Sequence, residues 1–107
     1  MADAELRRYP RVVPPKGLLV AWQSGTRRAV SYLESIALGG LFVVTRNPAP
    51  IRSVVKILVD LPFGEFRARA VVRRVQPAKG MAVEFIAMTQ EDRARLSKAL
   101  IPMFATQ

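Results

Sequence analysis

The sequence predicts an all-β protein, a small six-stranded antiparallel β-barrel followed by a C-terminal helix. Short stretches that alternate apolar and polar residues recur along the chain, and turns rich in glycine and proline separate them. Near the C-terminus the apolar spacing changes from two to that of a helix. The chain has 107 residues, which fits one domain with a single core. These features together favour a barrel with a packing helix.

The six strands are expected at residues 18–23, 27–33, 41–45, 54–61, 65–75 and 81–86. The sequences that separate them are typical of turns and loops, namely Ser24-Gly25, Leu38-Gly39-Gly40, Asn47-Pro48-Ala49-Pro50, Pro62-Phe63-Gly64 and the segment 76–80.

The longest predicted strand, 65–75, has one apolar and one cationic face. Its apolar positions are Phe66, Ala68, Ala70 and Val72, and its arginines are Arg67, Arg69 and Arg73. Strict alternation of this kind places one face on the core and the other on the surface. The arginines form either an ordinary solvent face or a wall that faces an anion.

The C-terminal segment is expected to form a helix that begins at Thr89. Thr89 with Glu91 and Asp92 is typical of a capped N-terminus with acids in the first turn. The apolar positions at helical spacing are Leu96, Leu100, Met103 and Phe104. Pro102 predicts that the helix ends or kinks near Leu100.

Composition narrows the function classes. The chain has no cysteine and no histidine, which removes thiolate sites, disulfides and the usual general base. The acids show no paired arrangement and there is no phosphate-cradling loop, so we expect a binding protein and no enzyme. No secretory signal and no membrane-spanning run are visible, so we expect a cytoplasmic protein without membrane insertion, and we expect no metal or cofactor.

The chain is strongly basic. Its net charge is +9, and 13 of its 17 basic residues are arginine. Such an excess favours an anionic partner, since the guanidinium fork grips phosphate and stacks on bases. An arginine-rich surface that serves solubility alone is the alternative.

Two segments carry the candidate binding residues. Residues 1–16 are expected to form an N-terminal arm, stiffened by prolines, in which Arg7 and Arg11 make an Arg-x-x-x-Arg pattern with Arg8 beside it. Residues 17–107 then form the barrel and the helix. The second segment is the turn from Ser35 to Gly40, where Gly39 and Gly40 allow close backbone approach.

This pair of motifs resembles the PilZ family, whose members bind the bacterial second messenger cyclic di-GMP. Arg7 and Arg11 match the family's arginine pair, and residues 35–40 align with its Asp/Asn-x-Ser-x-x-Gly motif. The segments 70–73 and 80–85 resemble two of its strands, and 92–96 resembles its helix. The resemblance implies cyclic di-GMP as the ligand, with Arg73 as a recurring arginine of the family.

The second motif departs from the family pattern at two positions. Ser35 stands in place of Asp/Asn, and Ala37 stands in place of Ser, which removes hydrogen bonds to the ligand. The alternative function is therefore a degenerate PilZ adaptor that binds a protein partner, through the barrel and the Leu96/Leu100 helix, in motility, pilus, biofilm or surface-polysaccharide control. Nonspecific nucleic-acid binding is a third hypothesis, although the eight aromatic residues lie mostly in core-like patterns.

Overall fold

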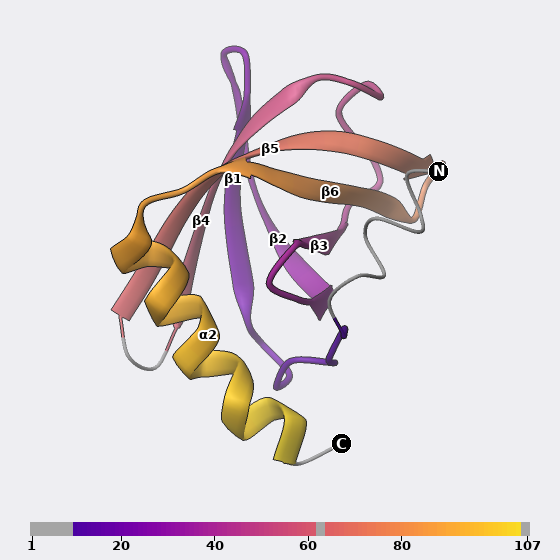
Figure 1. Cartoon of the computed structure of the whole chain (residues 1–107). Coiled ribbons are helices and arrows are strands. Elements are labelled where there is room, and N and C mark those ends of the chain that lie inside the picture. Colours follow the sequence, from indigo (N-terminus) through magenta and orange to yellow (C-terminus); the bar gives the residue numbers. More distant parts are fainter. Residues whose placement is uncertain (1–9, 62–63, 106–107) are drawn as a thin grey trace.

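The computed structural model describes residues 10–61 and 64–105, and there six antiparallel strands close into a barrel with a helix beside it (Figure 1). The elements are β1 (Leu19–Ser24), β2 (Arg27–Ile36), β3 (Gly40–Val44), β4 (Val54–Leu61), β5 (Gly64–Gln76), β6 (Gly80–Ala87) and α2 (Gln90–Ala105). The predicted all-β barrel with a C-terminal helix is confirmed.

The strands follow the order β1-β2-β3-β6-β5-β4 around the barrel, and β4 returns to pair with β1. That closing pair aligns Val20 with Val59 and Trp22 with Ile57, so core-facing side chains meet across the seam. Closure leaves no open strand edge, which removes a common route to aggregation.

The core follows the alternation predicted for the longest strand. On β5, Phe66, Ala68, Ala70 and Val72 are buried, while Arg67, Arg69 and Arg73 are exposed. Phe66 packs edge-to-face against Phe85 of β6, with ring centroids 5.8 Å apart. Most buried apolar residues of the other strands and of the helix join the same cluster.

Trp22 belongs to this core and is not available for stacking on a ligand. Its indole Nε1–H donates a hydrogen bond of 3.0 Å to the hydroxyl of Ser31, which satisfies the one polar atom of the buried ring. The guanidinium of Arg27 lies 4.9 Å from the ring centroid and donates a hydrogen bond to the carbonyl of Asn47. Arg27 therefore ties the β1–β2 turn to the loop that follows β3.

Strand β2 continues to Ile36, beyond the predicted end at Leu33. The register with β3 shifts between Leu33 and Ser35, so Glu34 is the extra residue of a β-bulge. The bulge restores the alternation after one residue and lets Ile36 enter the core. Periodicity along one strand could not predict it, because a bulge breaks the pattern used to find the strand.

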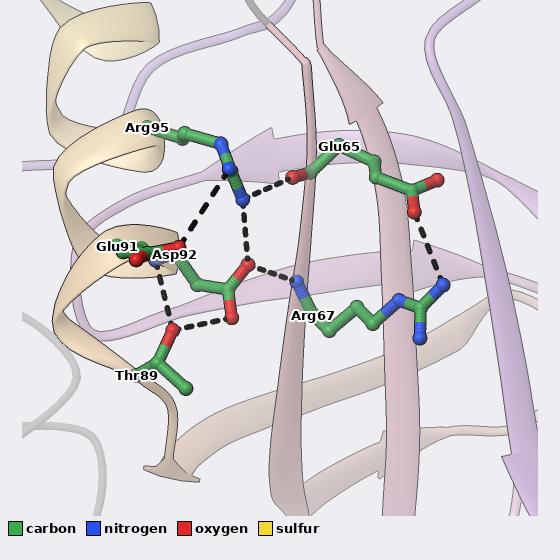
Figure 2. A network of polar contacts seen from close by, with 6 residues as sticks. All are labelled: Glu65, Arg67, Thr89, Glu91, Asp92 and Arg95. Atoms are coloured by element: carbon green, nitrogen blue, oxygen red, sulfur yellow. Dashed lines mark hydrogen bonds and ion pairs between the residues drawn. The ribbon is translucent and has the colours of Figure 1, made fainter.

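Helix α2 begins as predicted, and its first turn is joined to β5 (Figure 2). The Thr89 hydroxyl accepts the backbone N–H of Asp92 at 3.1 Å and donates to Asp92 Oδ2 at 2.7 Å. Asp92 Oδ1 accepts the backbone N–H of Arg67 at 3.1 Å. The Arg95 guanidinium lies 3.5 Å from that carboxylate and donates to the carbonyl of Glu65 at 3.4 Å. The Thr89 hydroxyl thus caps the helix, and the Asp92 carboxylate holds that hydroxyl and fixes the first turn to the sheet.

The helix does not end near Leu100, as Pro102 had predicted. It runs through Pro102 to Ala105. Pro102 has no N–H and so removes one intrahelical hydrogen bond, and burial of Leu100 and Met103 holds the last turn on the core.

Leu96 and Leu100, which identify the helix named as part of a possible protein-binding face, are themselves buried, with exposed fractions of 0% and 2%. They fill the barrel core, as their helical spacing allows. No helix within the described ranges is both long enough and apolar enough to cross a membrane.

We expect Asp92→Ala to lower the free energy of unfolding by about 1–3 kcal/mol, because the helix loses its cap partner and the Arg67 N–H loses its acceptor. Urea denaturation followed by the fluorescence of Trp22 measures the change. The adjacent Glu91→Ala is the matched control, since Glu91 is 85% exposed and makes only a 3.9 Å ion pair. It should change stability by less than about 0.5 kcal/mol. Equal effects of the two substitutions would contradict this role for Asp92.

Candidate functional site

The turn between β2 and β3 carries the second candidate motif. The backbone N–H of Ala37 donates to the carbonyl of Gly40 at 2.8 Å, which closes a tight turn. The carbonyl of Gly39 accepts the N–H of Phe85 at 2.9 Å, which fixes the turn to β6. Ser35 is half-buried, whereas Ala37 is buried. The turn is thus a rigid part of the barrel wall.

The proline-rich segment before β1 is bonded to this turn. Val12 and Ile36 form an isolated antiparallel bridge, with N–H···O distances of 2.9 Å and 3.0 Å in the two directions. The Val12 side chain is buried, while the neighbouring Arg11 is exposed. Because Val12 pairs with Ile36 in antiparallel direction, the preceding residue Arg11 lies beside the 35–40 turn.

Gly40 is required for a close approach between two backbones. It lies opposite Glu84 in the β3–β6 ladder. A Cβ added at Gly40 would overlap the carbonyl oxygen of Val83, a backbone atom that cannot move aside alone. Gly40 therefore has a structural role that does not depend on any ligand.

Arg73 is joined to the same region through Glu84. Its Nε and Nη2 donate to Glu84 Oε1 at 2.8 Å and 2.5 Å. Glu84 lies between Gly40 on β3 and Val71 on β5 in the register of the barrel. The Glu84 carboxylate therefore positions the guanidinium of Arg73 beside the turn.

Sequence analysis did not assign this pairing role to Glu84. A register shift in β5 between Val72 and Arg74 makes Arg73 a bulge residue, and a regular ladder would have placed Arg73 opposite Ala82 instead. The only signal in the sequence was an arginine and a glutamate on neighbouring predicted strands. That signal is weak, because it does not define the register.

An apolar pair lies beside Ser35 on the outer side of the barrel. Ser35 is in register with Phe42, and Phe42 with Ala82, and these two buried residues form a cluster separate from the main core. The Lys79 ammonium lies 5.9 Å from the Phe42 ring centroid and 3.8 Å from a carboxylate oxygen of Glu34. Phe42 was predicted only as a strand residue, since alternation does not distinguish a second apolar cluster from the core.

Five of the seven predicted site residues thus belong to one region of the barrel: Arg11, Ser35, Gly39, Gly40 and Arg73. Arg7 and Arg8 lie outside the described residues. The region combines guanidinium groups with a rigid turn, an arrangement suited to an anionic ligand. Within residues 10–61 and 64–105, no cluster of acidic side chains could hold a metal ion.

Comparison with known proteins assigns this architecture to a family. The family model described as the PilZ domain matches residues 5–101. No curated protein sequence matches the chain.

Solved structures with the same fold include the following three proteins, two of which are PilZ domains. The Bacillus subtilis inhibitor of motility MotI (DgrA) has a TM-score of 0.78 at 20% identity, over 94% of this chain and 53% of MotI. The PilZ domain of YcgR from Escherichia coli with cyclic di-GMP has a TM-score of 0.75 at 14% identity, over 94% of this chain and 92% of the YcgR domain. The PilZ domain of CeSA from a cellulose-synthesizing bacterium has a TM-score of 0.65 at 18% identity, over 91% of this chain and 97% of the CeSA domain. The chain therefore spans about half the length of MotI and nearly all of the isolated domains.

We expect Gly40→Ala to lower the free energy of unfolding by at least about 3 kcal/mol, the upper end of overpacking costs, because the clash is with backbone. Gly25→Ala is the control. A Cβ at Gly25 meets nothing within 4 Å, and its φ of 61° adds only the left-handed backbone cost, about 1–2 kcal/mol. Urea denaturation compares the two. Equal losses would mean that β3 and β6 do not need the glycine for close approach.

Proposed function

The chain belongs to the PilZ domain family, and we propose that it is a cytoplasmic receptor domain for cyclic di-GMP. The ligand would lie between an arm formed by residues 1–16 and the outer face of the barrel at the 35–40 turn. The observation that carries this proposal is the Val12–Ile36 bridge, which holds Arg11 of the arm next to the turn. The cyclic di-GMP complex of the YcgR PilZ domain, which has the same fold, supports this choice of ligand.

The proposed contacts follow from the chemistry of a dinucleotide with two phosphates. Arg7 and Arg11 grip phosphate and stack on guanine, and Arg8 adds positive charge. The turn residues Ser35, Gly39 and Gly40 form the floor of the site. Arg73, oriented by its bonds to Glu84, faces the ligand from β5. The net charge of +9 adds long-range attraction for this anion.

The two departures from the family motif have different consequences. Ser35 is half-buried, so its hydroxyl is the group that takes the place of the family's Asp/Asn side chain. Ala37 is buried within the turn, and its methyl side chain offers no hydrogen bond to a ligand. Each missing bond weakens binding by about 1–3 kcal/mol, or roughly 5- to 150-fold.

A second candidate function is that of an adaptor that binds a protein partner and no dinucleotide. The specific observation in its favour is the presence of Ser35 and Ala37 at two ligand-binding positions of the family motif. Regulation of motility or surface structures is the process proposed for either function, since MotI, which shares the fold, is an inhibitor of motility.

We expect Arg11→Ala to weaken binding of cyclic di-GMP at least tenfold, because it removes a charge-assisted bond to phosphate. Isothermal titration calorimetry measures the affinity, and Arg7→Ala should behave in the same way. Arg46→Ala, which removes an exposed arginine after the far end of β3, is the matched control and should keep the wild-type affinity. Loss of binding in all three variants would indicate general charge attraction and contradict a defined site.

We expect Ser35→Asp to tighten binding of cyclic di-GMP about tenfold, because a carboxylate accepts two hydrogen bonds from the guanine edge. Ser24→Asp adds the same charge at another half-buried strand serine and should not tighten it. Binding by Ser35→Asp but not by wild type would identify the natural protein as an adaptor. Absence of binding in wild type and in Ser35→Asp would reject the receptor function.

A further inference from the structure

The outer face of β2, β1, β4 and β5 carries two cross-strand rows that the proposed ligand site does not use. The first row is Val30, Ala21, Leu58 and Arg67, and the second is Arg28, Gln23, Lys56 and Arg69. The first row is apolar except at its β5 end, and the second is basic at three of its four positions. An apolar strip thus runs beside a basic strip across four strands.

The two rows border a hollow of about 730 Å³. Between the two rows, its lining is the row Ala29, Trp22, Ile57 and Ala68, whose side chains pack in or against the core on the other side of the sheet. Val30 stands at its margin with 66% of its surface exposed. The hollow has the size of a ligand or side-chain pocket rather than of a surface irregularity.

The hollow is electropositive. Its lining includes Arg28, Lys56, Arg67 and Arg69, and no acidic residue. Within the described residues Arg67 forms an ion pair with Glu65 at 3.1 Å, as Figure 2 shows. The side chains of Arg28, Lys56 and Arg69 form no ion pair or hydrogen bond with the described residues. Their charges are therefore available to an anionic partner.

This hollow is distinct from the proposed ligand site. In the order of strands around the barrel, the β1–β4 seam lies opposite the β3–β6 seam. The proposed ligand site gathers around the β2–β3 turn and Glu84 of β6, with Arg73 of β5, whereas the hollow is centred on β1 and β4. Binding at the hollow can therefore be measured separately from binding of cyclic di-GMP.

We propose that the hollow is a docking site for an acidic segment of a partner protein that inserts an apolar side chain between the two rows. Charge complementarity favours an acidic occupant and disfavours a second copy of this chain, whose net charge is +9. A concave apolar floor fits an anchoring side chain. A lipid surface is better matched by protruding apolar groups, and single-stranded nucleic acid by aromatic platforms, which the lining offers only in the buried Trp22.

The test uses fluorescence anisotropy with a labelled synthetic peptide of alternating glutamate and leucine pairs as the probe. Comparison peptides replace leucine by serine, or glutamate by lysine. The hollow variant is Arg28→Glu with Arg69→Glu, and the matched control is Lys16→Glu with Arg46→Glu, since both lower the net charge of +9 by the same amount. Val30→Ser tests the apolar margin. Cyclic di-GMP titration of each variant keeps this result separate from the proposed ligand site.

We expect the Glu/Leu peptide to bind wild type and the control pair, and to bind the hollow variant at least tenfold more weakly. Val30→Ser and the serine peptide should each reduce binding several-fold. Equal weakening in the hollow and control variants would overturn the proposal, because it would show attraction by net charge alone. The proposal would also fail if phosphatidylglycerol vesicles or oligothymidine bound more tightly than the peptide and lost binding only in the hollow variant.

Discussion

The close approach of β3 and β6 is the constraint on which the rest of the structure depends. Glycine occupies both ends of this pairing, since Gly40 lies opposite Glu84 and Gly80 lies opposite Val44. A Cβ at either glycine would overlap a carbonyl oxygen of the facing strand. With these two strands in contact the remaining four can close the ring, and every central backbone group gains a ladder partner.

The candidate site is a consequence of this approach. The short distance between β3 and β6 places Glu84 beside the turn at Gly40, and Glu84 in turn orients Arg73. The same turn presents Ile36 to the bridge with Val12. Residues far apart in the sequence are thus positioned by backbone hydrogen bonds, and the arginines need little reordering to meet an anion.

Sequence alone predicted the strands and the helix start because alternation and capping are local patterns. Phe66 to Val72 and Thr89 to Asp92 express such patterns within a few residues. The bulges at Glu34 and Arg73, and therefore the Arg73–Glu84 pair, depend on how two strands align, which no single strand encodes. The helix end predicted from Pro102 was wrong for a related reason, because tertiary burial of the last helical turn outweighed the low helix propensity of proline.

A closed ring also separates the two outer faces physically. Each strand is bonded on both sides, so a change on the β3–β6 face cannot open or slide the β1–β4 seam without breaking ladder bonds. Substitutions near Gly40 and in the hollow beside Val30 lie on opposite sides of the barrel and share no partner, and their energetic effects should add.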